Sequence, residues 1–328
     1  MRPSVSRLLC PPLLAALTLL VTAGPAFAEF SRNSALAQAR ALVPNASLPS
    51  DALPASVTAY ENIPYLNAKG TDLQLDIYRP DGRAPVPAVL IVHGGGWEEG
   101  SRQMERPLAQ QLAARGFAAI PVSYRLGAKG RFPAPLDDLK AAVRWVRSHA
   151  SDYGIDPTRI GAIGGSAGGQ LVALLGASNG VAALEGYEGD DRDYSSVVQA
   201  VVDIDGVADF VSYDLISQEE AKQGATSRYL GGPYSKAGPT WHQASATTYL
   251  SKMSAPCLFI NSTVTHPILP GRSVMQNRLL GLGVYSKLIV IPDTPHPFWL
   301  LNPWFEQVLD DCEAFLNRYM EPRKPGTA

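Results

Sequence analysis

The sequence predicts an α/β fold in which a mostly parallel, twisted sheet carries helices on both faces. Strand-like and helix-like segments alternate between residues 88 and 175, and this alternation is typical of a parallel sheet covered on both sides. Two of the predicted strands also run straight into glycine-rich turns, at residues 94–96 and 164–168. Parallel sheets carry their functional loops at the carboxyl ends of the strands, so we expect both turns at one site.

The predicted strands cover residues 58–66, 71–78, 88–92, 117–124, 160–163, 197–204, 256–261 and 287–291. The first two should form a hairpin, because Leu73, Leu75 and Ile77 alternate with polar residues. Helices are expected at residues 107–115, 136–149, 171–175 and 304–319, and a further helix with a loosely held lead-in before residue 55. Residues 136–149 place apolar side chains opposite charged ones, which indicates an amphipathic helix.

A lid-like insertion is predicted at residues 206–252, after the strand that ends at Asp205. Strand and helix signals weaken there, and Tyr213, Tyr229 and Trp241 are scattered among polar residues. Two interpretations are open: these aromatic side chains shape a substrate cleft, or they form a local core.

Composition indicates a globular chain. Its 328 residues are 46% hydrophobic and 18% charged, which suits one large α/β domain, and we expect a single domain over residues 29–328. The formal net charge is −2, and Lys and Arg are scattered. Nucleic-acid binding needs a clustered positive face. No nucleic-acid partner is therefore predicted, and the oligomeric state is left without a prediction.

Residues 1–28 are typical of a cleavable secretory signal peptide. Arg2 and Arg7 precede a mostly apolar run at 8–21, and Ala26-Phe27-Ala28 matches an A-x-A cleavage site. The run is shorter than the ~20 apolar residues of a membrane-spanning helix, and prolines interrupt it. We expect a mature protein that begins near Glu29, lies in the periplasm or outside the cell, and keeps no stable membrane association.

The cysteines do not suggest a metal site. Cys10 belongs to the signal peptide, while Cys257 and Cys312 lie in an apolar strand and a terminal helix, where buried thiols are expected. Export would permit a bridge between these two, so that alternative stays open. Because the chain has no HExxH motif and no grouped Cys/His pattern, neither a metal nor another cofactor is predicted.

Gly164-Gly165-Ser166-Ala167-Gly168 is the G-x-S-x-G pattern of a nucleophilic serine on a sharp strand-to-helix turn. Only small neighbours fit such a turn, which presents the serine hydroxyl at the top of the sheet. A plain glycine-rich connection or a phosphate cradle would give a similar pattern. Ser166 is therefore a candidate nucleophile, and the context in the rest of the sequence must decide between this role and a plain glycine-rich connection or phosphate cradle.

That context is His93-Gly94-Gly95-Gly96-Trp97, which follows the apolar run 88–92. An HGGG motif accompanies the serine turn in lipases and esterases, where backbone N–H groups stabilise an oxyanion. We predict an oxyanion hole formed by the N–H groups of Gly95, Gly96 and Ala167. Two motifs in the expected order, each after a strand, favour this interpretation over two unrelated loops.

With both motifs in place, the chain resembles the α/β-hydrolase superfamily, and within it the esterases that carry His-Gly-Gly-Gly-Trp. The similarity extends to Tyr153-Gly-Ile-Asp-Pro157 before the serine strand. More narrowly, the segments 294–299 and 302–305 resemble secreted bacterial carbohydrate esterases, the pectin acetylesterases and acetyl xylan esterases. The resemblance implies an α/β-hydrolase fold over nearly all of the mature chain.

His296 is the predicted catalytic base. An unassisted serine hydroxyl is a poor nucleophile, and the superfamily's chain order of Ser, acid and His puts the base after the last strand, where His296 lies. His149 ends a helix and is expected at the surface, and His242 lies in the insertion. His266 occupies the loop that usually carries the acid, and His93 is expected to orient the glycine loop.

The acid departs from the superfamily pattern. The loop at 261–270 contains no carboxylate, although relatives usually present an Asp there. We predict Asp205, at the carboxyl end of the preceding strand, as the residue that orients His296. Asp203 lies one pleat deeper, and Asp209 is expected to cap a helix. Asp293 is the main rival, and a Ser-His dyad without an acid is also open.

Trp97 and Trp299 are assigned to substrate binding, because aromatic faces suit sugar rings. Trp304 and Phe305 are expected to pack into the core. Together with secretion, the resemblance implies removal of short acyl groups, foremost O-acetyl groups, from a plant cell-wall polysaccharide such as pectin or xylan; the partner would be that acetylated saccharide or another small ester. Alternatives are a general short-chain carboxylesterase, a serine peptidase of the same fold and a catalytically silent binding protein.

Overall fold

The computed structural model describes residues 30–82, 84–263 and 271–321. The predicted signal peptide and His266 lie outside the described residues. One eight-stranded sheet forms the centre, in the order β1-β2-β4-β3-β5-β6-β7-β8. From β4 to β8 neighbouring strands are parallel, while β1 and β2 form an antiparallel hairpin that also pairs antiparallel with β4. The predicted fold class, a mostly parallel sheet with helices, is therefore confirmed.

The eight predicted strands are all present, with shifted ends. They are β1 (Val57–Asn67), β2 (Asp72–Pro80), β3 (Val86–Val92), β4 (Ala118–Val122), β5 (Ile155–Gly165), β6 (Val201–Ile204), β7 (Cys257–Asn261) and β8 (Ser286–Val290). The expected alternation of Leu73, Leu75 and Ile77 gives three buried side chains, and all three pack into one core cluster. The hairpin thus contributes its apolar face to the sheet.

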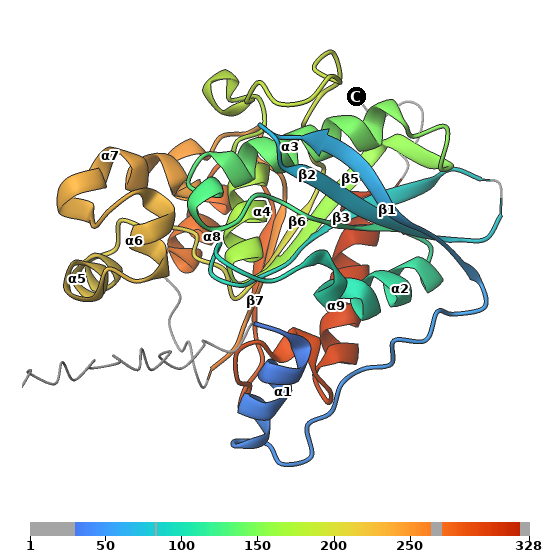
Figure 1. Ribbon diagram of the computed structural model, residues 1–328, viewed down its shortest axis with the longest axis horizontal. Helices are drawn as coiled ribbons and strands as arrows, with labels where there is room; N and C mark the ends of the chain where they lie inside the picture. Colours follow the sequence, from blue (N-terminus) through green and yellow to red (C-terminus); the bar gives the residue numbers. More distant parts are fainter. Residues whose placement is uncertain (1–29, 83, 264–270, 322–328) are drawn as a thin grey trace, which may run out of the picture.

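Helices cover both faces of the sheet (Figure 1). They are α1 (Arg32–Arg40), α2 (Arg106–Ala114), α3 (Ala134–Ser148), α4 (Ala167–Ala177), α5 (Tyr213–Lys222), α6 (Ala225–Leu230), α7 (Tyr234–Ala244), α8 (Arg272–Gly281) and α9 (Phe305–Tyr319). Strand β3 shows the two faces clearly, because Leu90 packs in the cluster with α3 and α4 whereas Val89 and Ile91 pack in the cluster with α2 and α9. A strand buried on both faces has a continuous apolar sequence, as observed.

The insertion is more helical than its sequence suggests. It contains α5, α6 and α7, which project to one side of the sheet in Figure 1. Helix α7 contains Pro239, and Ala237 has non-helical angles, so a kink interrupts the period that a sequence pattern needs. Tyr229 and Trp241 are buried, whereas Tyr213 is 83% exposed. Tyr229 and Trp241 are therefore core residues, as in the second of the two interpretations left open.

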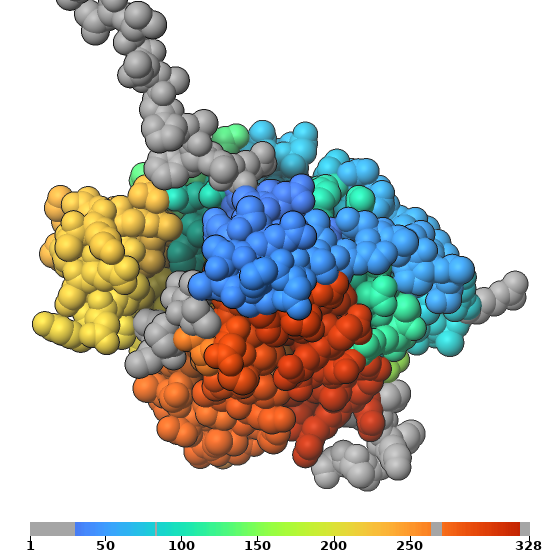
Figure 2. Space-filling model, turned by 90° about the horizontal axis from the view of Figure 1, so that it is seen from below, coloured from blue at the N-terminus to red at the C-terminus, as the bar shows by residue number. Residues whose placement is uncertain are grey.

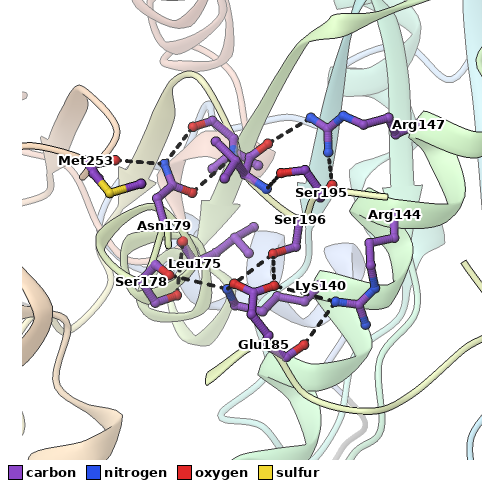
Figure 3. A network of polar contacts seen from close by, with 12 residues as sticks. Lys140, Arg144, Arg147, Leu175, Ser178, Asn179, Glu185, Ser195, Ser196 and Met253 are labelled. Atoms are coloured by element: carbon purple, nitrogen blue, oxygen red, sulfur yellow. Dashed lines mark hydrogen bonds and ion pairs between the residues drawn. The ribbon is translucent and has the colours of Figure 1, made fainter. Parts of the chain in front are cut away.

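The segment between α4 and β6 is held on α3 by three basic side chains (Figure 3). Lys140 Nζ lies 2.8 Å from Glu185 Oε1, and Arg144 Nη1 donates to the Glu185 carbonyl oxygen at 2.9 Å. Arg147 donates to the carbonyl oxygen of Val197 at 2.8 Å. The two arginine contacts satisfy backbone carbonyl groups of a segment that has little regular structure of its own.

Cys257 and Cys312 carry buried thiols, as expected, and both are free, so the bridge that the sequence left open is not formed. Among the described residues, no helix is long and apolar enough to cross a membrane. Over the same ranges, no group of three or more His, Cys, Asp or Glu side chains is arranged to hold a metal ion.

Candidate active site

Ser166 occupies a strained turn between β5 and α4. Its backbone angles are φ 56° and ψ −119°, outside the regions that non-glycine residues ordinarily adopt. The flanking glycines are required by close approaches: a Cβ at Gly164 would lie 2.2 Å from Gly168 O, and one at Gly168 would lie 2.0 Å from Val92 O. The Ser166 N–H donates to Ile204 O at 2.8 Å, which ties the turn to the end of β6.

The glycine loop after β3 lies against this turn. A Cβ at Gly94 would come within 3.1 Å of Ser166 Cβ. Gly95 and Gly96 have φ values of 117° and 60°, so the loop adopts a conformation that favours glycine. Within the described residues, no hydrogen bond uses the N–H groups of Gly95, Gly96 or Ala167. The three predicted oxyanion donors thus lie on the two segments that meet at Ser166.

His93 holds the loop and is suited to orientation, not proton transfer. Its Nδ1 lies 2.7 Å from Gly94 O, and because a carbonyl only accepts, the ring donates there. The ring stacks on Tyr124 with centroids 4.5 Å apart, and the Tyr124 hydroxyl donates to His93 O at 2.9 Å. Burial lowers the pKa of His93 to about 4, although the Gly94 carbonyl acts in the opposite direction. The imidazole is therefore neutral near pH 7.

Three side chains fasten the far part of the loop. Trp97 stacks on Tyr229 of α6 with centroids 4.6 Å apart. Glu98 forms a two-point ion pair with Arg228, at 2.5 and 2.6 Å. Glu99 Oε2 accepts the N–H of Phe30 at 3.0 Å. The insertion and the N-terminal segment thus lie beside the glycine loop, and Figure 2 shows both on one face of the molecule, with recessed atoms between them.

Asp205 and His296 are brought together by the ends of β6 and the segment after β8. Asp205 Oδ2 lies 3.0 Å from His296 Nδ1, and its other oxygen accepts the N–H of Ser262 at 2.7 Å. Burial acts to raise the pKa of Asp205, but the contact with His296, the charge of Arg272 and the Ser262 N–H outweigh it, so the pKa lies below its usual value. The Asp205 carboxylate is therefore ionised near neutral pH and has a hydrogen-bond partner at each oxygen.

The other carboxylates have different partners. Asp203 is fully buried, receives Arg272 Nη2 at 2.6 Å and accepts the Gly206 N–H at 2.7 Å. Burial raises its pKa to about 6 against the effect of Arg272. Asp293 is exposed, and its N–H donates to the Thr263 hydroxyl at 2.8 Å. These placements favour Asp205 over Asp293 as the partner of His296.

The expected helix cap at Asp209 is wrong. Ser212 is the N-cap of α5, while Asp209 accepts the N–H of Val211 at 2.9 Å and closes a local turn. A short polar side chain can satisfy a nearby backbone N–H in either way, and the sequence does not distinguish them.

The remaining described histidines lie elsewhere. His149 follows the last turn of α3, where its ring stacks on Trp145 with centroids 4.2 Å apart. His242 lies on α7, 3.0 Å from the Tyr234 hydroxyl. Neither residue shares a described contact with Ser166 or Asp205, so His296 is the histidine that the described contacts place with the candidate acid.

Trp97 and Trp299 are not the exposed stacking faces that the sequence suggested. Trp97 is 6% exposed and donates its indole N–H to Gln170 Oε1 at 3.0 Å. Trp299 is 1% exposed and packs under Gly165, where a Cβ would lie 2.2 Å from its ring. Both rings are buried by residues distant in sequence, which no local pattern reveals. Trp304 and Phe305 are buried, as expected.

A wide surface hollow of about 1240 Å³ lies at the opposite end of the strands. Arg159, Gln199 and Pro256, which precede or begin the buried parts of β5, β6 and β7, contribute to its wall. Ser166 and His296 do not line it. The site therefore rests on the convergence of side chains at the carboxyl ends of the strands, not on this hollow.

Similar proteins carry esterase names. The chain is 31% identical over 223 residues to the esterase LipQ of Mycobacterium tuberculosis, a match of 64% of this chain and 49% of LipQ. It spans about half or less of the length of the first curated relatives that it matches.

Solved structures have the same fold. A truncated carbohydrate esterase from gut microbiota has a TM-score of 0.71 and 25% identity, with 84% of this chain and 100% of that one covered. A propionate-bound esterase from Thermogutta terrifontis has a TM-score of 0.65 and 25% identity, over 84% and 98% of the two chains. Residues 75–277, more than half of the sequence, match the BD-FAE family model. This chain therefore belongs to the BD-FAE family, an α/β-hydrolase family.

Proposed function

We propose that this chain is a serine carboxylic ester hydrolase that removes short acyl groups. The carrying observation is the Asp205–His296 contact of 3.0 Å at the same end of the sheet as the strained Ser166 turn. A nucleophile, an oriented imidazole and uncovered backbone N–H groups are the parts that acyl transfer requires. The esterase names of the relatives support this reaction class.

In the proposed reaction Ser166 Oγ attacks the ester carbonyl carbon while His296 takes the hydroxyl proton. Asp205 holds the imidazole in the required tautomer and stabilises the imidazolium. The N–H groups of Gly95, Gly96 and Ala167 bind the oxyanion. The imidazolium then protonates the departing alcohol, and water, deprotonated by His296, releases the acyl group from the serine.

The proposed natural substrate is an O-acetyl ester on a plant cell-wall polysaccharide such as pectin or xylan. The similarity to a carbohydrate esterase from gut microbiota supports this proposal, as does the predicted signal peptide. We further propose one catalytic domain over residues 29–328, exported after cleavage near Glu29. Fractionation of cells that express the full chain, with sequencing of the mature N-terminus, tests the export.

A general short-chain carboxylesterase is the second candidate. The burial of Trp97 and Trp299 favours it, because neither ring offers a face for a sugar. The propionate in the Thermogutta esterase also belongs to a simple short-chain acid. A carbohydrate esterase and a general esterase would differ in their preference for the alcohol part of the ester.

The test compares the wild type with Ser166→Ala. The wild type should hydrolyse an aryl acetate, and the variant should lose at least about a thousandfold in kcat with an unchanged circular dichroism spectrum. Acetate release from acetylated pectin, acetylated xylan and simple acetates then separates the two candidate substrates, and peptide substrates run in parallel test the peptidase alternative. Wild-type turnover in Ser166→Ala would disprove the role of this serine.

A further inference from the structure

Glu105 is a buried carboxyl group that the proposed chemistry does not use. It ends the short helix η1 (Arg102–Glu105), caps α2 and is 1% exposed. Its Oε1 has no hydrogen-bond partner among the described residues, and the indole Nε1 of Trp299 is also buried without one. Burial raises the pKa of Glu105 to about 7, while the Trp299 N–H and Arg32 of α1 act in the opposite direction. The carboxyl group and the indole N–H are therefore two buried groups without a hydrogen-bond partner in the described part of the chain, close enough for the N–H to lower the pKa of the carboxyl group.

Trp299 connects that carboxyl group to the candidate nucleophile and base. Its ring lies under Gly165, the residue before Ser166, so closely that a Cβ there would overlap it. The same ring meets His296 edge to face, with centroids 5.1 Å apart. A rotation of this indole would therefore press on the serine turn and on the imidazole together.

A second link, through charge and not through a direct contact, leads from Glu105 toward the glycine loop. Burial raises the pKa of Tyr124, and the charge of Glu105 adds to the effect, so the two side chains interact. Tyr124 stacks on His93 and donates to its carbonyl oxygen. Arg32, Tyr124 and Trp299, from three different segments, are thus the groups to which Glu105 is electrostatically coupled.

We propose that Glu105 is a positioning residue of this site, whose carboxyl group holds the Trp299 indole where it supports the Ser166 turn and the His296 ring. The indole N–H is the only polar atom of the ring, so an acceptor opposite it fixes the in-plane orientation. Small displacements of reacting groups lower turnover strongly. The inference rests on the proposed esterase function.

The experiment measures kcat and KM of Glu105→Met, Glu105→Gln and Trp299→Phe with an aryl acetate. Glu105→Met keeps the shape without an acceptor, so kcat should fall about tenfold or more with KM within about twofold. Glu105→Gln keeps an acceptor oxygen and should recover most of the lost kcat. Adding Glu105→Met to Trp299→Phe should change kcat no further, because the N–H is already absent.

Gln110→Leu is the matched control. Gln110 lies on α2, is 3% exposed and also has a side-chain oxygen without a described partner. Its variant should keep wild-type kcat. Wild-type kcat in Glu105→Met, an equal loss in Gln110→Leu, or an undiminished further loss in the Trp299→Phe background would each overturn the proposal.

If Glu105→Met does not fold, Trp299→Phe decides: a lowered kcat with unchanged KM supports the proposal, and wild-type kcat overturns it. A wild type without ester turnover would instead disprove the proposed function, so the two failures are distinguishable.

Discussion

Asp205 Oδ2 lies 3.0 Å from His296 Nδ1, although 91 residues separate them in the chain. The contact forms because β6 and β8 end at the same edge of the sheet with β7 between them. Asp205 itself has φ 52° and donates its N–H to Ile260 O at 3.0 Å, which fixes the side chain toward that edge. The acid at the end of β6 thus contacts the imidazole, whereas the superfamily pattern usually places the acid in the loop after β7.

Replacing Asp205 by Asn should lower kcat by about 10³- to 10⁴-fold, because an amide neither stabilises the imidazolium nor keeps the same tautomer. Asp293→Asn is the control, since Asp293 is exposed and contacts Thr263 through its backbone. Steady-state kinetics with an aryl acetate and a thermal unfolding curve for each variant provide the measurement. A large loss in Asp293→Asn with normal turnover in Asp205→Asn would reverse the assignment.

Gly95→Ala should lower kcat by about 10²- to 10³-fold through loss of oxyanion binding. Gly95 has φ 117°, and a Cβ there would lie 2.0 Å from Glu99 O, so the loop must rearrange. Gly281→Ala is the control, because its Cβ would meet nothing within 4 Å at the end of α8, and it should be neutral or slightly stabilising. Equal kinetic parameters for the two variants would contradict the role of the loop.

Arg272→Met should destabilise the fold by about 3–5 kcal/mol, because it leaves the buried Asp203 charge without its partner. Both side chains of that pair are at most 1% exposed. Arg228→Met removes an ion pair whose side chains are 56% and 35% exposed, so the expected cost is below about 1 kcal/mol. Denaturant unfolding gives both free energies. Similar costs for the two variants would show that burial does not decide the effect.

Glu105→Gln should flatten the pH dependence of stability between pH 4.5 and 7. The folded-state pKa of Glu105 is about 7, against an ordinary value of 4.5. The unfolded chain therefore releases this proton first as pH rises, and the wild type loses up to about 3 kcal/mol of stability across that window. The raised pKa of Asp203 also lowers stability as pH rises, but equally in the wild type and in Glu105→Gln. The difference between their two pH profiles therefore measures the contribution of Glu105. Urea unfolding at pH 5 and pH 7.5 measures it, and parallel losses would contradict the prediction.

The sequence predicted the sheet well because buried parallel strands have continuous apolar runs, as Val89, Leu90 and Ile91 show. The Ser166 turn was also predictable, since Gly164 is required by the backbone of Gly168, which lies only four residues away. A glycine that is required by the backbone of a residue close in sequence becomes part of a short motif, which can be recognised without the structure.

Features that depend on distant contacts were not predictable. Trp299 packs against Gly165, a residue far away in sequence, and belongs to a core cluster, whereas its aromatic character alone suggested an exposed binding face. Asp205 and Asp293 remained rivals because only the folded chain shows which one is buried beside His296. Helix α7 was not predicted, because a kink at Ala237 interrupts the helical periodicity of its apolar residues.

The free thiols of Cys257 and Cys312 have a practical consequence for labelling. Burial raises the pKa of both groups, so little reactive thiolate forms. A cysteine introduced at Tyr213, which is 83% exposed, would be the thiol that a maleimide dye reaches within the described ranges. One fluorophore on α5 would then report any change in the position of the segment 206–252, without removal of either native cysteine.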